Sequence, residues 1–391
     1  MEEEGERGGE GAGGVRQEGV AGASSCRADA RARAAVAMSG GVDSSLAAAL
    51  LVEQGYEVVG LTMQLWPRER EEDMPPAMRG CCGLDAIDSA RRLARHLGIR
   101  HYVSNLREPF ERFVIDPFCD EYAEGRTPNP CIRCNTFVKF GPLLHRAREI
   151  GCEKLATGHY ARVLHDDRVG RWKLLRGVDQ TKDQSYSLYG LTQDQLAHAL
   201  FPLGDLTKTQ TRRKAAELGL PAAERAESQE ICFITGEDYR RYLERRRPEV
   251  LIPGPIVDTA GRQIGRHRGV AFHTIGQRQG LGVAAGRPLY VLGIDAAANR
   301  LIVGERDEAV FRGLVMRDAN YVSIFALPET GMKLAVQIRS TARPVACHAR
   351  PEGERVVVEF AQPERAVAPG QAAVCYDGDA VALGGVIESG F

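Results

Sequence analysis

The chain has 391 residues, too many for one ordinary hydrophobic core, which predicts two or three domains. Its composition, 43% hydrophobic and 26% charged, is typical of a globular protein in water, and no apolar run approaches the ~18 residues of a membrane span, so we expect no membrane partner. A formal net charge of -1 excludes a protein that is basic all over, so a nucleic-acid partner would have to meet a local basic face.

The first 33 residues differ in composition from the rest of the chain. Residues 1–33 are rich in Gly, Ala, Glu and Arg and lack apolar periodicity, which predicts a disordered tail. Five glutamates in the first ten residues argue against a mitochondrial transit peptide, which is normally poor in acids. Ten cysteines without a secretory signal predict reduced thiols and a cytoplasmic location rather than a disulfide framework.

A glycine-rich loop follows the first predicted strand. The apolar run 34–38 is typical of a buried parallel strand; it ends at Ser-Gly-Gly-Val-Asp-Ser-Ser, residues 39–45, and an Ala/Leu-rich helix follows over 46–52. The glycines let the backbone approach a ligand, and the first N–H groups of the helix favour an anion. The Gly-Lys-Ser/Thr ending of a Walker A loop is missing. A plain strand-to-helix turn capped by Asp43 is the structural alternative to a phosphate site.

The next elements predict an α/β fold. A second strand over 56–63 precedes a helix with one apolar face over 87–97, which Gly98 closes, and a short strand follows over 101–103. Strands that alternate with helices in this way form a doubly wound parallel sheet. Ligands of such sheets bind at the carboxyl ends of the strands, where Ser39 and Met63 fall.

Two motif cysteines lie in Gly-Arg-Thr-Pro-Asn-Pro-Cys-Ile-Arg-Cys-Asn, residues 125–135. Because two prolines stand within four residues, we expect Cys131 and Cys134 on a loop that enters a helix at about 136–150. Cys134 then lies near a helix N-terminus, where a thiolate is favoured. The Cys-x-x-Cys spacing by itself also suits a redox pair or a zinc site.

The rest of the chain changes from α/β to β-rich. We expect a strand over 154–160, a hairpin over 162–175, a polar loop over 182–186, and a helix that a Thr207/Gln210 capping box begins. Beyond Gly236 a basic helix leads into short strands, which predict a small β-rich central domain, 237–308, and a C-terminal β-barrel, 309–391. The arginines of the basic helix and of 262–278 indicate a phosphate-binding face rather than a merely solvated one.

Taken together, the motifs resemble those of the tRNA-specific 2-thiouridylase family. The glycine loop resembles the PP-loop of enzymes that split ATP into AMP and pyrophosphate. With it come Gly-Leu-Thr-Met, the Cys-x-x-Cys motif, Ala-Thr-Gly-His-Tyr, Lys-Asp-Gln-Ser-Tyr, Ser-Gln-Glu-Ile-Cys-Phe and His-Thr-Ile-Gly-Gln-Arg-Gln-Gly-Leu-Gly, in family order over roughly residues 35–391.

The resemblance implies an ATP-dependent exchange of oxygen for sulfur at C2 of the wobble uridine in tRNAs for Lys, Glu and Gln. It implies a PP-loop catalytic domain, 34–236, a tRNA-contacting central domain and a barrel that grips the tRNA. ATP with Mg²⁺, near Asp43, would activate the base, and a cysteine desulfurase or a sulfur-relay protein would supply a persulfide.

The resemblance also implies the site residues. Cys134 is the nucleophile or resolving thiol and Cys232 carries the persulfide. Those that contact ATP are Ala37, Met38, Ser39, Gly40, Gly41, Val42, Asp43, Ser44, Met63 and Gly158. Those that contact tRNA are Asn129, Pro130, Cys131, Lys182, Asp183, Gln184, Arg339 and Ser340.

One position departs from the family pattern. Many members have an aspartate, with a proton-transfer role, where this chain has Cys131, and a thiol is a poorer general acid and a better metal ligand. Cys131, Cys134 and Cys232 could instead hold a [4Fe–4S] cluster that binds the sulfide.

Two further functions are compatible with parts of the pattern. A PP-loop ligase that delivers nitrogen would share the glycine loop, but the motif cysteines disfavour it. An RNA-binding or iron–sulfur protein with a degenerate nucleotide site is disfavoured by the intact loop serines and Asp43.

Overall fold

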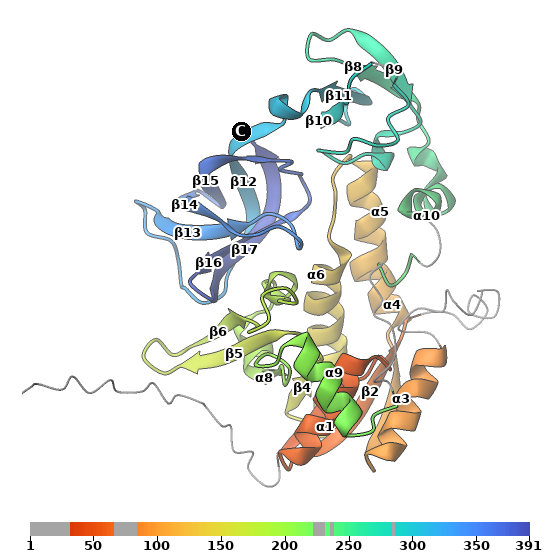
Figure 1. The fold of residues 1–391 in the computed structure, drawn as a ribbon, viewed down its shortest axis with the longest axis vertical. Helices are drawn as coiled ribbons and strands as arrows, with labels where there is room; N and C mark the ends of the chain where they lie inside the picture. The colour runs from red at the N-terminus through yellow and green to blue at the C-terminus, as the bar shows by residue number, and fades with distance from the viewer. Residues whose placement is uncertain (1–31, 66–83, 222–230, 235–237, 284–285) are drawn as a thin grey trace, which may run out of the picture.

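The computed structural model describes residues 32–65, 84–221, 231–234, 238–283 and 286–391. Within them lie three β-sheets, each with its own hydrophobic core (Figure 1). Residues 1–31 of the tail expected over 1–33, and residues 228–230 of the Ser-Gln-Glu-Ile-Cys-Phe motif, lie outside the described residues. Arg33, the last residue of the expected tail, instead begins the first strand. No helix within the described part of the chain is long and apolar enough to cross a membrane.

The first sheet is parallel and has five strands in the order β3-β2-β1-β4-β7. β1 lies at its centre because the middle of its Arg-Ala-Ala-Val-Ala sequence is apolar and fully buried. This confirms the predicted α/β class. The strands are β1 (Arg33–Ala37), β2 (Glu57–Gln64), β3 (Arg100–Asn105), β4 (Lys154–Ala156) and β7 (Ala199–Leu200).

Helices connect these strands. α1 (Val42–Glu53) and α3 (Leu84–His96) pack their alanines and leucines in one core with the central strands, and they stop where Gly55 and Gly98 adopt φ of 85° and 66°. α9 begins with the predicted Thr207/Gln210 capping box. The other helices are α4 (Arg107–Phe110), the π-helical turn η2 (Glu111–Ile115), α5 (Asp116–Ala123), α7 (Leu144–Glu149), η4 (Ser185–Leu188), α8 (Gln193–His198) and α9 (Lys208–Glu217).

The expectation that both motif cysteines lie on a loop is wrong. Cys131 and Cys134 belong to a short helix, α6 (Pro130–Cys134), which continues into the π-helical segment η3 (Asn135–Leu143). Asn129 caps α6, with its Oδ1 3.1 Å from the backbone N of Cys131. Pro130 stands at the first helical position, where proline has no N–H to lose and its fixed φ suits the helix. Pro130 therefore starts the helix instead of preventing it.

The central region forms a sheet of four strands in the order β10-β11-β8-β9. These are β8 (Gly254–Val257), β9 (Gln263–His267), β10 (Tyr290–Asp295) and β11 (Arg300–Gly304). The basic helix α10 (Tyr239–Arg246) precedes them and ends before Pro248, as the sequence predicts. The β-rich character of this region is thus confirmed.

The C-terminal strands close into a barrel in the order β12-β15-β14-β13-β16-β17, because β17 also pairs with β12. The hairpin β5–β6 extends this sheet from outside, since Ala380 of β17 pairs with Leu175 of β6 (Figure 1). A hairpin from the α/β part thereby joins the barrel. The strands are β5 (Ala161–Asp166), β6 (Arg171–Arg176), β12 (Val310–Tyr321), β13 (Met332–Gln337), β14 (Val345–Glu352), β15 (Arg355–Arg365), β16 (Ala372–Asp377) and β17 (Ala380–Gly390).

Candidate nucleotide and thiol site

A cavity of about 200 Å³ opens at the carboxyl ends of β1, β2 and β4. Seven of the residues predicted to contact ATP line it: Ala37, Met38, Ser39, Asp43, Ser44, Met63 and Gly158. Gly40, Gly41 and Val42 complete the loop but are not among the lining residues, and the side chain of Val42 is buried in the core. The position agrees with the rule for ligand sites in parallel sheets.

Hydrogen bonds fix the shape of the loop. The Ser39 backbone N–H donates to Ser44 Oγ over 3.2 Å, and the hydroxyls of Ser44 and Ser45 donate to the Gly41 carbonyl. Gly40 has a φ of 73°, which favours glycine. The loop is therefore preformed, with the N-terminus of α1 directed at the cavity.

Gly158 lets the turn after β4 approach the N-terminus of α1. A Cβ on Gly158 would stand 2.7 Å from the carbonyl carbon of Asp43 and 2.8 Å from the backbone N of Ser44. Real Cβ atoms do not come so close to backbone atoms. The second residue after β4, Gly158, must therefore be glycine for the loop to keep this position.

Asp43 has partners that the sequence reasoning missed. Lys208 Nζ lies 2.8 Å from each carboxylate oxygen of Asp43, and the Tyr160 hydroxyl donates to Oδ1 over 2.8 Å. Lys208 is buried at the start of α9, and the predicted capping box already placed it at the first helical position. What the sequence did not show is that α9 packs beside α1.

A second missed lysine lies on the cavity wall itself. Lys139 of η3 lines the cavity, and its Nζ donates to Asn135 Oδ1 over 2.8 Å. His159 also lines it, with Nδ1 2.6 Å from the Thr157 hydroxyl. Burial, with a smaller contribution from Lys139, holds the pKa of His159 well below its usual value, so this imidazole is neutral near pH 7. Lys139 thus supplies the positive charge that the loop sequence lacks.

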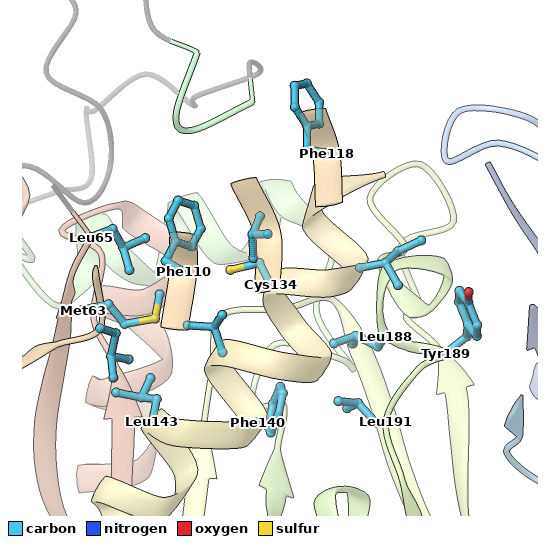
Figure 2. Close-up of a cluster of buried hydrophobic side chains, with 14 of the residues drawn as sticks. Met63, Leu65, Phe110, Phe118, Cys134, Phe140, Leu143, Leu188, Tyr189 and Leu191 are labelled. Carbon is cyan, nitrogen blue, oxygen red and sulfur yellow. The ribbon is translucent and has the colours of Figure 1, made fainter. Parts of the chain in front are cut away.

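The three candidate cysteines differ in exposure. Cys131 is exposed, Cys134 is buried and Cys232 is half-buried, and no disulfide joins any of the described cysteines. Cys134 belongs to the hydrophobic cluster that also holds Met63 and Phe110 (Figure 2). Cys232 packs against the same cluster. Met63 in turn lines the nucleotide cavity. One cluster therefore connects the cavity with both predicted reactive thiols.

The remaining described cysteines are shielded. Burial raises the pKa of Cys119 to about 11 and also raises that of Cys152. Cys375 lies in the barrel core, where a hydrogen bond to Cys347 and burial raise its pKa further. A raised pKa keeps the thiols of Cys119, Cys152 and Cys375 protonated and unreactive near neutral pH.

The described side chains do not form a metal-binding site. Among the described residues, no three His, Cys, Asp or Glu side chains come together as a metal site requires. Cys131, Cys134 and Cys232 are all described and do not form the ligand set of the expected [4Fe–4S] cluster in this arrangement. Both oxygens of Asp43 already bind Lys208, so the expected Mg²⁺ position at Asp43 does not fit either.

A second cavity, of about 330 Å³, lies between α6 and the barrel. Asn129 lines it from the α6 side, and Arg317 and Asn320 line it from the barrel. Pro130 is buried and Cys131 exposed at the start of the same helix. The predicted target-base segment thus lies where the α/β part and the barrel face each other.

A chain of hydrogen bonds connects the two other predicted tRNA segments. Ser185 donates to Asp183 Oδ2 over 2.8 Å, and the Tyr376 hydroxyl lies 3.2 Å from Ser185 Oγ and 3.3 Å from Gln337 Oε1. Gln337 Nε2 donates to the carbonyls of Arg339 and Ser340. The side chains of Arg339 and Ser340 are exposed, whereas Gln184 lines the nucleotide cavity.

Arginines in and after α10 take part in ion pairs within the protein. Arg247 binds Asp120 over 2.6 Å, Arg246 binds Glu111, and Arg268 binds Glu244 over 2.8 Å. These pairs neutralise part of the positive charge that the sequence pattern assigned to a phosphate-binding face. The phosphate-binding face itself stays a prediction.

Three family models match consecutive parts of the chain: the tRNA methyl transferase HUP domain over residues 32–236, the tRNA methyl transferase PRC-barrel domain over 240–305 and the Aminomethyltransferase beta-barrel domain over 311–387. The chain is 53% identical over 355 residues to the tRNA-specific 2-thiouridylase MnmA of Moorella thermoacetica, covering 90% of this chain and 99% of that protein. It is 50% identical to the protein of the same name from Heliobacterium modesticaldum, covering 90% of this chain and 91% of that protein. The chain belongs to the tRNA-specific 2-thiouridylase family.

Proposed function

We propose that this protein is a tRNA-uridine 2-sulfurtransferase, which uses ATP to replace O2 of a uridine in tRNA by sulfur. The family membership supports the reaction, and the proposed substrate is the wobble uridine of the tRNAs for Lys, Glu and Gln. The single observation that carries the proposal is structural. Met63 lines the nucleotide cavity and belongs to the hydrophobic cluster that contains Cys134 and against which Cys232 packs.

ATP is needed because the C2 oxygen of a uracil is a poor leaving group. In the first step this oxygen attacks the α-phosphorus of ATP, the bond to the β-phosphate breaks and pyrophosphate leaves. The loop N–H groups and the hydroxyls of Ser39 and Ser44 bind the phosphates. Lys139 faces the cavity and offsets the negative charge that develops. The base is then an adenylate, from which AMP can leave.

The second step brings sulfur to C2. A desulfurase or relay protein leaves a persulfide on Cys232, and its terminal sulfur attacks C2 of the adenylate. Cys134 then attacks the Sγ of Cys232, so that the S–S bond of the persulfide breaks, a Cys134–Cys232 disulfide forms and AMP departs with the former O2. An external thiol must reduce this disulfide before the next turnover. Cys134 belongs to the hydrophobic cluster and Cys232 packs against it. The disulfide requires the two sulfurs to come within bonding distance.

Recognition of tRNA is assigned to three segments, Asn129–Cys131, Lys182–Gln184 and Arg339-Ser340. In the first segment Asn129 lines the cavity between α6 and the barrel. The other two segments are connected through the hydroxyl of Tyr376. We assign catalysis to the unit near 34–236 and the remaining tRNA contacts to units near 237–308 and 309–391. The three separate sheets support this division.

We assign a divalent metal ion a role only in complex with ATP. The protein side chains that the structure describes do not form a site of their own for it, so a Mg²⁺ that arrives with ATP would be held mainly by phosphate oxygens and water. No step here depends on an iron–sulfur cluster. The three cysteines are used instead as a persulfide carrier, a resolving thiol and, for Cys131, a neighbour of the base.

The reaction is tested with the full-length protein, ATP, an unmodified tRNA and a persulfide-generating cysteine desulfurase. Nucleoside mass analysis of the digested tRNA should reveal a uridine in which one oxygen has become sulfur, together with AMP and pyrophosphate. Omission of ATP should abolish the product. Release of AMP together with a product that carries nitrogen instead of sulfur would identify a nitrogen-delivering ligase.

Cysteine variants test the roles of the thiols. C134S and C232S should form no 2-thiouridine, yet both should still release pyrophosphate when tRNA and ATP are present, because activation precedes sulfur transfer. Cys347→Ala, at a buried barrel thiol, is the control and should retain the product. Normal thiolation by C134S or C232S would refute the assigned roles.

A further inference from the structure

Two phenylalanines and two arginines form a stack on the surface near Cys131. The rings of Phe113 and Phe137 are stacked, with centroids 6.0 Å apart and an angle of 25° between their planes. The Arg112 guanidinium lies 5.2 Å from the Phe113 centroid, and that of Arg133 lies 5.1 Å from the Phe137 centroid. We call these four residues the Phe137 stack. The Phe137 side chain is 43% exposed, so its ring is accessible from solvent.

The Phe137 stack opens into the cavity between α6 and the barrel. Arg133 and Phe137 both line this cavity, as does Asn129 at the start of α6. Its volume of about 330 Å³ is in the range of sites that hold small molecules or single nucleotides. The exposed Cys131 lies between Asn129 and Arg133 in the chain, so the stack borders the segment assigned to the target base.

Charge distinguishes the arginines of the stack from their neighbours. The two carboxylates of the cavity are matched, since Glu121 binds Arg126 over 2.6 Å and Asp318 binds Arg317 over 2.5 Å. Within the part of the chain that the structure describes, no carboxylate lies within ion-pair distance of Arg112 or Arg133. Arg133 is instead held by a hydrogen bond from its Nε to the Phe113 carbonyl, 2.7 Å away. The stack therefore presents aromatic faces together with two guanidinium groups, of which Arg133 is attracted at longer range by Glu121.

We infer that the Phe137 stack binds an unpaired RNA nucleotide next to the target uridine, with the base on the exposed ring of Phe137 and a phosphate near Arg112 or Arg133. Single-stranded bases stack on aromatic side chains and guanidinium planes, and the cations meet the backbone. The inference rests on the proposed function, because it takes tRNA as the substrate. It adds a specific contact outside the three segments assigned to tRNA above.

Binding of an unmodified tRNA transcript to the full-length protein tests this inference. Phe137→Leu keeps an apolar side chain but removes the ring, and the Kd for tRNA should rise roughly 5- to 150-fold, the range of one lost base–aromatic stack. The matched control is Phe325→Leu. Phe325 is 69% exposed and also lies under an arginine, Arg171, at 4.7 Å, but it does not line the cavity. This control should bind tRNA like the unchanged protein.

A fluorescence measurement gives a second, independent readout. In Phe137→Trp the indole should be quenched when tRNA is added, because a base stacks on it, whereas Phe325→Trp should not be quenched. A Kd within twofold of the unchanged protein for Phe137→Leu, or an unquenched Trp at 137, would overturn the inference. Loss of sulfur transfer by Phe137→Leu with normal tRNA binding would also overturn it, since that result indicates a protein partner.

The failure of this inference is distinguishable from that of the proposed function. If the unchanged protein forms 2-thiouridine and Phe137→Leu does so with the same KM for tRNA, the stack does not contact the substrate. If the unchanged protein forms no 2-thiouridine in the complete reaction, the proposed function itself fails.

Discussion

Lys208 and Asp43 are 165 residues apart in the chain, and the Lys208 ammonium lies 2.8 Å from both oxygens of the Asp43 carboxylate. Asp43 lines the nucleotide cavity, whereas Lys208 does not and contacts it only through Asp43. Lys208 is therefore a positioning residue. It fixes the aspartate of the loop and neutralises a negative charge beside the place where phosphates bind.

Removal of this ammonium should weaken ATP binding. In Lys208→Met the Asp43 carboxylate keeps its charge and loses the ammonium that neutralises it, so it repels the phosphates of ATP. We expect the Kd for ATP to rise roughly tenfold or more. Asp43→Asn in the same background removes the repulsion and should recover most of the affinity. ATP titration by calorimetry measures all three proteins.

Lys214→Met is the matched control for this experiment. Lys214 is an exposed lysine on the same helix, α9, and it does not contact Asp43. ATP should bind this variant normally. Equal ATP affinity in Lys208→Met and Lys214→Met would exclude a positioning role for Lys208, and a double variant no better than Lys208→Met would exclude the electrostatic explanation.

A methyl group at position 158 should displace the phosphate loop. The new Cβ in Gly158→Ala would fall 2.7–2.8 Å from backbone atoms of Asp43 and Ser44, which cannot move aside as a flexible side chain can. Overpacking of this kind costs about 1–3 kcal/mol, and we expect a rise in the Kd for ATP of roughly 5- to 150-fold. The measurement is again an ATP titration, accompanied by a thermal melt.

Gly293→Ala serves as the control, because a Cβ at that position in β10 meets Ile302 only at 3.5 Å, an ordinary contact. It tests whether any Gly-to-Ala change lowers ATP binding through general destabilisation. Unchanged ATP affinity in Gly158→Ala would mean that the loop tolerates the displacement.

The strand–loop–helix unit was predictable because local sequence determines it. The apolar run of β1, the glycine turn and the helix stop at Gly55 each involve a few neighbouring residues, and all three are present. The α6 helix was missed although its signal is also local. Asn129 before Pro130 is a cap followed by a proline at the first helical position, and the prolines were instead given weight as helix breakers.

Contacts between distant segments were not predictable from one sequence. The hairpin β5–β6 was expected, yet nothing within it indicates that Leu175 pairs with Ala380 of the barrel. In the same way, no local pattern assigns Lys208 to Asp43 or Lys139 to the cavity wall. Such contacts follow from how the helices and sheets pack, and one sequence without its fold does not specify that packing.

Tyr376 should couple the loop at 182–184 to the barrel turn at 339–340. Its buried hydroxyl lies between Ser185 and Gln337, and Gln337 holds the turn carbonyls. In Tyr376→Phe we expect a loss of stability of about 1 kcal/mol and a several-fold rise in the KM for tRNA at unchanged kcat, because the turn loses its support. Steady-state thiolation kinetics and a thermal melt test this.

Tyr186→Phe separates this coupling from a general loss of stability. Tyr186 is as deeply buried, and its hydroxyl donates to the Ala372 carbonyl of the same strand, β16, but it does not reach Gln337. The control should lose similar stability and keep its KM for tRNA. If both variants raise the KM equally, the hydroxyl of Tyr376 has no specific role.

Acid should destabilise the central region through His273. This histidine is buried, and burial, with smaller contributions from His267 and Arg240, lowers its pKa from 6.5 to about 4. As the pH falls from about 6.5 to about 4, the unfolded chain takes up a proton that the folded protein does not, so the free energy of unfolding decreases, by up to about 3 kcal/mol.

The variant His273→Gln tests this pH dependence. It cannot take up this proton, so its apparent Tm should fall less than that of the unchanged protein between about pH 7 and pH 4.5. His145→Gln, at a side chain that is 75% exposed, should follow the unchanged protein. Equal shifts in Tm for all three proteins would show that protonation of His273 does not contribute.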